Sequence, residues 1–160
     1  MSRTIPPRTP VVIFLVMSLM VSGLLPSQPV CAADSSPAGL LWLADLDLTK
    51  MTSGWGKPLP NQSIQGQPLT LAGHVYKNGV GTHADSLLFI NLKGSATRFT
   101  SSLGVDDETG KKGSIQGKIY GDGKKLFDSG IIKGGAEPAA IDLNVEGLQQ
   151  LILVITDAGD

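Results

Sequence analysis

The apolar residues of this chain occur in short bursts, and this spacing limits the available folds more than any other feature. From Leu40 onward the bursts are separated by glycine, asparagine and proline, and no 3.6-residue period lasts for three turns. Long amphipathic helices are therefore not expected, and the pattern is typical of an all-β domain. Roughly eight short strands at such spacings indicate a β-sandwich.

Two segments near the C-terminus give the clearest strands. Apolar and polar side chains alternate from Ala140 to Val145, which predicts a strand with one buried and one solvated face. Residues 151–155 are all apolar, which predicts a central strand covered on both faces. Further strands are expected at 87–92 and 97–103, and Trp42 is expected in the core, within a first strand.

Two glycine-containing turns are expected to form hairpins. Gly121-Asp122-Gly123 separates two strand-like runs and can supply the positive φ angles of a tight turn. Asn78-Gly79 offers the same turn chemistry upstream. Gly117 lies between apolar neighbours on one strand face, where it predicts either a packing hole or a bulge.

The N-terminus has the features of an export signal. Arg3 and Arg8 precede an apolar run from Val11 to Leu25, and small residues follow up to Ala32. This order is typical of a secretory signal peptide cleaved after Ala32. A membrane anchor is the alternative, but polar residues interrupt the run and it is shorter than the roughly 20 residues that span a bilayer. We predict a signal peptide at 1–32, a short leader at 33–39, one domain at 40–160, and a secreted or periplasmic location.

Cleavage would leave 160 − 32 = 128 residues, enough for a single core. The only cysteine, Cys31, would leave with the signal, so disulfides and thiolate chemistry are not expected in the domain. Loss of Arg3 and Arg8 would change the net charge from −1 to −1 − 2 = −3. A mildly acidic domain without a basic stripe is not expected to bind nucleic acid, and after cleavage no membrane contact is expected.

Three acidic residues, Asp106, Asp107 and Glu108, stand together in "LGVDDETG". A glycosidase pair would need two carboxyls facing each other across a cleft, about 5–5.5 Å or 6.5–9.5 Å apart, and neighbours on a turn rarely converge in this way. The spacing of an EF-hand calcium loop is also absent. Two interpretations stay open: acceptors for sugar hydroxyls, or a turn that is solvated or braced by its own backbone N–H groups.

Three other side chains are candidates for sugar contact, each with a structural alternative. Trp55, between two glycines, could offer its ring face to a pyranose or close one end of the sandwich. His83, in "GVGTHADS", could bind a ligand or be structural. Arg98 could donate to ring hydroxyls or point to solvent from an alternating strand. Asp157 and Asp160 could be calcium ligands, but two carboxylates do not diagnose a site, so a metal stays undecided.

Five segments together resemble the NPCBM domain, a carbohydrate-binding module found beside glycoside hydrolases. They are "SGWGKP" (53–58), "PLTLAGHVYKNGVGTHADS" (68–86), "LGVDDETGKKGS" (103–114), "YGDGKKLFDSG" (120–130) and "VITDAGD" (154–160). The resemblance runs from about residue 41 to the last residue. It implies a jelly-roll β-sandwich of the galactose-binding-domain-like type, and it implies that the family's last strand is missing from this chain.

The same resemblance implies non-catalytic binding of a galactose-containing glycan, which would hold an associated glycoside hydrolase near its substrate. The expected site residues are Trp55, His83, Asp106, Asp107, Glu108 and Arg98. One alternative is a secreted interaction or adhesion sandwich without a sugar pocket. A second is a small glycosidase that uses Asp107 or Glu108 with another acid.

Overall fold

The computed structural model describes residues 11–15 and 39–159. Its strands are β1 (Val11–Leu15), β2 (Leu59–Pro60), β3 (Leu69–Leu71), β4 (His74–Tyr76), β5 (Gly79–His83), β6 (Ser86–Asn91), β7 (Arg98–Val105), β8 (Ser114–Gly121), β9 (Lys124–Lys133), β10 (Ala139–Asn144) and β11 (Gln150–Asp157). Three single-turn 3-10 helices, η1 (Leu43–Asp45), η2 (Leu48–Lys50) and η3 (Asp107–Thr109), lie in the connections.

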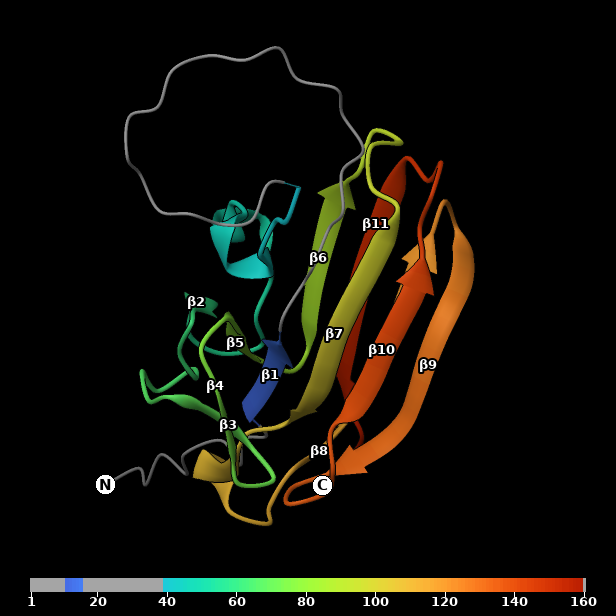
Figure 1. Ribbon diagram of the computed structural model, residues 1–160. Helices are drawn as coiled ribbons and strands as arrows, with labels where there is room; N and C mark the ends of the chain where they lie inside the picture. The colour runs from blue at the N-terminus through green and yellow to red at the C-terminus, as the bar shows by residue number, and fades with distance from the viewer. Residues whose placement is uncertain (1–10, 16–38, 160) are drawn as a thin grey trace, which may run out of the picture.

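Two antiparallel sheets pack face to face as a β-sandwich (Figure 1). The first has the strand order β10-β7-β1-β5-β2, and the second has the order β6-β11-β8-β9. Strands β3 and β4 form a separate hairpin. The predicted all-β sandwich is confirmed.

The core lies between the sheets and contains side chains from both. Leu151, Leu153 and Ile155 of β11 are buried together with Phe99 and Leu103 of β7. A fully buried side chain of this kind contributes roughly 1.5–3 kcal/mol. This apolar packing and the backbone ladders hold the domain together, because its described residues contain no cysteine.

The expectation that β11 is covered on both faces was wrong. The strand is central, between β6 and β8, but Ile152 and Val154 on its second face are only half-buried. A continuous apolar run does not by itself distinguish these two arrangements.

One of the two predicted hairpin turns is confirmed and the other is wrong. Asp122 (φ 46°) and Gly123 (φ 81°) join β8 to β9, with Gly121 paired to Lys124. Upstream, however, the two-residue turn is Ala72 (φ 48°) and Gly73 (φ 80°), which joins β3 to β4. Gly79 instead begins β5, where its N–H donates to Asn61 Oδ1 at 3.0 Å.

We expected a first strand around Trp42, with its side chain in the core. The structure instead forms the 3-10 turns η1 and η2 in this part of the chain. Trp42 is half-buried and precedes η1, whereas its neighbour Leu43 is the buried residue. Asp47 stabilises the second turn, because its side chain accepts the N–H of Thr49 at 3.2 Å.

Gly117 produces the bulge that its position predicted. The β8–β9 register shifts between Gln116 and Lys118. There is no packing hole, because Leu103 from the facing sheet fills the space: a Cβ atom on Gly117 would lie 2.0 Å from Leu103 Cδ2. The missing side chain therefore lets the two sheets approach closely at this point.

The N-terminal predictions fall largely outside the described residues. Within the predicted signal peptide only Val11–Leu15 is described, as β1, and of the leader only Gly39 is described. The signal peptide, its cleavage and the absence of a last strand stay predictions. Over the described ranges 11–15 and 39–159, no helical segment has the length and hydropathy to cross a lipid bilayer.

Candidate functional site

A loop that contains Trp55 is clamped onto the turn between β5 and β6. The N–H of Thr52 donates to the carbonyl oxygen of Leu87 at 2.9 Å, and the N–H of Gly54 donates to that of His83 at 3.1 Å. The contact is so close that a Cβ on Gly54 would lie 2.2 Å from the carbonyl oxygen of Ala84. This clamp holds Trp55 against the end of β5.

Trp55 and His83 form an edge contact at this end of the sandwich. Their ring centroids are 6.4 Å apart and the ring planes meet at 66°. The two differ in exposure, because Trp55 is 51% exposed whereas His83 is 7% exposed. An exposed indole therefore lies beside a buried imidazole, which places an apolar ring next to a polar group.

The two nitrogens of the His83 imidazole differ in their hydrogen bonding to the described part of the chain. Nδ1 contacts the carbonyl oxygen of Ala84, and the N–H of His83 donates to Ser53 Oγ at 3.1 Å. A carbonyl only accepts hydrogen bonds, so Nδ1 carries the proton, and in the neutral ring Nε2 is then an acceptor. Nε2 is buried and has no hydrogen-bond partner among the described residues. It is suited to accept a hydrogen bond from a hydroxyl group.

A carboxylate that the sequence analysis did not single out lies next to this pair. Asp85 is exposed, and its Oδ1 accepts the N–H of Asp157 at 2.9 Å, which ties the turn after β5 to the end of β11. Its position two residues after His83, within "GVGTHADS", was the signal that could have indicated it. Asp157 Oδ1 in turn accepts the N–H of Gly159 at 2.8 Å.

No group of three or more metal-binding side chains (His, Cys, Asp or Glu) occurs over residues 39–159. Asp160, the other suggested calcium ligand, lies outside the described residues. The question of calcium stays open.

Asp106 and Asp107 brace the fold with their carboxylates. Asp106 is 1% exposed; its Oδ2 accepts the N–H of Thr70 at 3.0 Å and its Oδ1 accepts that of Glu108 at 2.8 Å. Asp107 accepts the N–H groups of Ala72 at 3.1 Å and Gly73 at 2.7 Å. Both side chains therefore secure the β3–β4 hairpin and η3, and Asp106 has no surface to offer a ligand.

Glu108 contacts the loop that follows β2. Its Oε2 accepts a hydrogen bond from Ser63 Oγ, and its Oε1 is buried with no partner over the described ranges. Burial raises the pKa of Glu108, an effect that the Ser63 hydroxyl partly offsets. Burial likewise raises the pKa of Asp106 against the opposing effect of the Thr70 and Glu108 N–H groups.

The strand register shows which predicted site residues lie near one another. Val12 pairs with Thr82 on one side and with Val105 on the other. The acidic turn after Val105 and His83 after Thr82 therefore lie at the same end of the sheet, separated by two strand spacings or about 10 Å. Trp55 and His83 are in contact, whereas Asp106 and Asp107 bind the β3–β4 hairpin and Glu108 binds the loop after β2.

Arg98 lies apart from this end of the sheet. It begins β7, seven residues before Val105, which corresponds to about 23 Å of extended strand. Its guanidinium makes two hydrogen bonds to the carboxylate of Asp142 on β10. The structure does not bring Arg98 together with Trp55 and His83.

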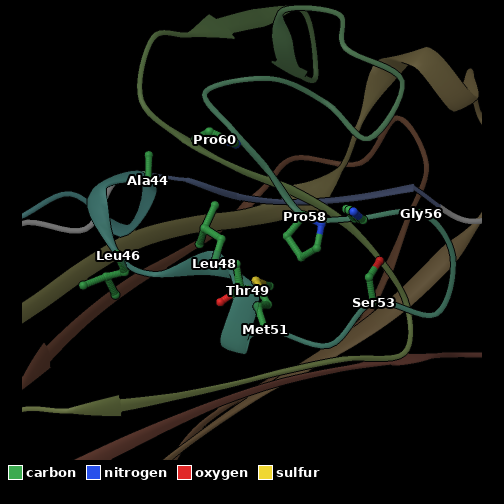
Figure 2. Close-up of a pocket in the computed structure, with 10 residues that line it drawn as sticks. Ala44, Leu46, Leu48, Thr49, Met51, Ser53, Gly56, Pro58 and Pro60 are labelled. Carbon is green, nitrogen blue, oxygen red and sulfur yellow. The ribbon is translucent and has the colours of Figure 1, made fainter.

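A cavity of about 440 Å³ opens near Trp55 but does not include the predicted site residues (Figure 2). Its lining is largely apolar and comes from the 3-10 turns and the loop to β2. Ser53 and Gly56, on either side of Trp55, are part of that lining. The residues that line it are Ala44, Leu46, Leu48, Thr49, Met51, Ser53, Gly56, Lys57, Pro58 and Pro60.

The profile of the NPCBM/NEW2 domain matches residues 39–160. The chain belongs to the NPCBM/NEW2 family. A solved CBM51 module from Clostridium perfringens GH95, in complex with methyl-galactose, is 32% identical to this NPCBM/NEW2 chain, with a TM-score of 0.69 over 75% of this chain and 88% of that one. A CBM51-2 structure from C. perfringens ZmpB, in complex with GlcNAc, is 23% identical with a TM-score of 0.69 over 74% of this chain and 27% of that one, and supports the fold alone.

Two curated relatives are much longer proteins. One, from Renibacterium salmoninarum, is named as an endo-alpha-N-acetylgalactosaminidase and is 28% identical over 84% of this chain. The other, alpha-1,3-galactosidase B from Akkermansia muciniphila, is 23% identical over 87% of it. The matches span only 9% and 18% of those proteins. The predicted family and fold are confirmed, and this NPCBM/NEW2 domain is a carbohydrate-binding module.

Proposed function

We propose that Trp55, His83 and Asp85 form a shallow site for a single galactose-type sugar ring. The observation that carries this proposal is the buried Nε2 of His83, which lies beside an exposed indole and has no hydrogen-bond partner over residues 11–15 and 39–159. A pyranose has one C–H-rich face, which packs on an indole, and hydroxyls around its edge that need partners. The 32% identical module in complex with methyl-galactose supports the choice of sugar.

Each residue has a distinct part in this site. Trp55 supplies the stacking surface, Nε2 of His83 accepts a hydrogen bond from one hydroxyl, and the exposed carboxylate of Asp85 accepts from another. Because Nε2 is buried in the unliganded chain, binding through it requires a neighbouring side chain to move. Trp55 is an exposed neighbour in edge contact with the imidazole, and we propose that its side chain turns aside when the sugar binds.

The proposed role of this domain is to hold a glycoside hydrolase near a glycan that contains galactose. A site of this size buries little surface, so binding of one sugar is weak, and the benefit comes from raising the local concentration of the linked enzyme. In this proposal the domain itself is not catalytic, because the carboxylates of Asp106 and Asp107 already accept hydrogen bonds from backbone N–H groups of the hairpin. Export by the predicted signal peptide would place it outside the cytoplasm.

The experiment is a calorimetric titration with methyl-galactose, with GlcNAc and glucose for comparison. Trp55→Ala should weaken binding of methyl-galactose at least tenfold, which corresponds to about 1.4 kcal/mol. Phe89→Ala is the matched control, since Phe89 is also 51% exposed but lies in the middle of β6. Arg98→Ala is a second control, and both should bind as the unchanged chain does.

Equal binding by Trp55→Ala and the unchanged chain would contradict the proposed site. A chain that binds none of these sugars but self-associates or captures a protein would favour the interaction or adhesion alternative. Turnover of chromogenic galactosides above buffer would favour the glycosidase alternative.

A further inference from the structure

The hydroxyl of Ser53 makes a hydrogen bond to each of the two residues whose rings meet at the proposed sugar site. It donates to the carbonyl oxygen of Trp55 at 2.7 Å, and it accepts the N–H of His83 at 3.1 Å. A single hydroxyl can make both bonds, because it has one proton to donate and two lone pairs to accept with. The main chains of Trp55 and His83 are therefore joined through one oxygen atom.

The chain on either side of Trp55 has little restraint of its own. Gly54 precedes it and Gly56, at φ 67°, follows it, and glycine has access to more backbone conformations than any other residue. The indole is also 51% exposed, so packing restrains it less than it would a buried ring. The position of Trp55 against His83 thus depends on the hydrogen bonds that fix the loop.

Two other hydroxyls attach the start of this loop to β6. Ser86 Oγ donates to the carbonyl oxygen of Thr52 at 2.8 Å, and Thr52 Oγ1 accepts the N–H of Leu87 at 2.9 Å. The main-chain hydrogen bonds from Thr52 and Gly54 to the β5–β6 turn complete this attachment. These bonds fix the loop as far as residue 54, and the hydroxyl of Ser53 extends the attachment to Trp55.

We propose that Ser53 is a positioning residue of the sugar site, whose hydroxyl sets where the indole of Trp55 stands relative to the imidazole of His83. This inference rests on the proposed function, in which one sugar ring meets both side chains. The proton of the hydroxyl is donated to the carbonyl of Trp55, so the role of Ser53 is exerted through the main chain and not by contact with the sugar. With its main chain fixed, the indole can turn about its side-chain bonds when the sugar binds and stay beside His83. A loop held in this way loses less conformational entropy on binding.

Nuclear magnetic resonance of the sugar-free chain tests the positioning directly. The edge contact between the rings should give a nuclear Overhauser effect between ring protons of Trp55 and His83. This ring signal should be lost in Ser53→Ala and restored in Ser53→Thr. Threonine keeps the hydroxyl, and Ser53 lines the cavity of Figure 2, which has room for the added methyl group.

Ser95→Ala is the matched control. The hydroxyl of Ser95 also donates to a carbonyl oxygen at 2.7 Å, that of Leu92. It lies between β6 and β7, at the end of β6 away from the β5–β6 turn. The ring signal should therefore be unchanged in this variant. A signal lost equally in Ser53→Ala and Ser95→Ala would overturn the proposal, since the fold as a whole would then have loosened.

Calorimetry with methyl-galactose gives the second readout. Ser53→Ala should weaken binding roughly fivefold, as expected for the loss of one hydrogen bond. Ser53→Thr and Ser95→Ala should both bind as the unchanged chain does. Weaker binding by Ser53→Ala with an unchanged ring signal would overturn the proposal, because the hydroxyl would then act on the sugar itself.

The two readouts separate the failure of this inference from the failure of the proposed function. If the unchanged chain binds no methyl-galactose, the proposed function fails. The ring signal needs no sugar, so it still decides whether Ser53 positions Trp55 against His83. An undiminished signal in Ser53→Ala would overturn the positioning role, and its loss with recovery in Ser53→Thr would support it.

Discussion

Asp107 accepts a hydrogen bond from the N–H of Gly73 at 2.7 Å, across 34 residues of sequence. Its other oxygen accepts the N–H of Ala72, so one carboxylate binds both residues of the β3–β4 turn. The acidic run that first suggested ligand chemistry thus holds a hairpin against the end of the main sheet. Charged acceptors of backbone N–H groups form some of the stronger hydrogen bonds in proteins.

Asp107→Ala should therefore lower the free energy of unfolding by about 1–3 kcal/mol, because two turn N–H groups lose their acceptor. Urea denaturation followed by circular dichroism measures this loss. Asp142→Ala is the matched control: Asp142 is exposed and pairs with Arg98, so its loss should destabilise the chain less than the loss of Asp107 does. Similar losses for both variants would contradict the bracing role, and methyl-galactose affinity should be unchanged in each.

His83→Phe separates the polar function of the imidazole from its volume. Phenylalanine keeps a ring at a 7% exposed position but removes the Nε2 acceptor and the Nδ1 contact with Ala84. Methyl-galactose binding should weaken at least tenfold, measured by calorimetry. His83→Gln keeps a polar side chain and should recover part of the affinity. Full binding by His83→Phe would assign the histidine a packing role alone.

The raised pKa of Glu108 predicts how stability changes with pH. Burial makes ionisation harder in the folded chain than in the unfolded one, where the pKa is near 4.5. The contribution of this group to stability is fully present below pH 4.5 and is lost as the pH rises through the raised folded value. The stability of the unchanged chain relative to Glu108→Gln should thus fall across that window in urea titrations.

Asp142→Asn provides a control of opposite sign. The hydrogen bonds from Arg98 lower the pKa of Asp142 below 3.8, so its contribution is present above 3.8 and is lost as the pH falls through the folded value. The stability of the unchanged chain relative to Asp142→Asn should rise with pH over that range. A Glu108→Gln difference with this same sign would contradict the assigned effect of burial.

Gly117→Ala tests the contact between the two sheets. The added methyl group would lie 2.0 Å from Leu103 Cδ2, so the variant should lose about 1–3 kcal/mol of stability through overpacking. Leu103→Ala in the same chain should relieve that clash, so the two effects should not be additive in a double-mutant cycle. Gly123→Ala is a control at a positive-φ turn with no neighbour within 4 Å, where no such coupling is expected. Additive losses would contradict the packing account.

The sequence by itself was enough to predict the fold class, one hairpin turn and two of the candidate site residues. The spacing of apolar bursts was enough to predict an all-β sandwich, because strand periodicity and turn residues are local properties. The Asp122-Gly123 hairpin was predictable for the same reason. Trp55 and His83 could be selected as candidates because their glycine neighbours allow close approach.

Only the tertiary structure decided which candidates lie together and which serve the fold. The carboxylates of Asp106 and Asp107 have the same chemistry whether they face a sugar or a hairpin. Their hairpin partners, Thr70 and Gly73, lie 36 and 34 residues earlier in the chain. Asp85 is a candidate only because the folded chain places it beside Trp55 and His83, where its carboxylate also binds the end of β11. Likewise, nothing local in Val11–Leu15 separates an apolar export signal from a central strand. These outcomes depend on long-range pairing and burial, which local sequence patterns do not encode.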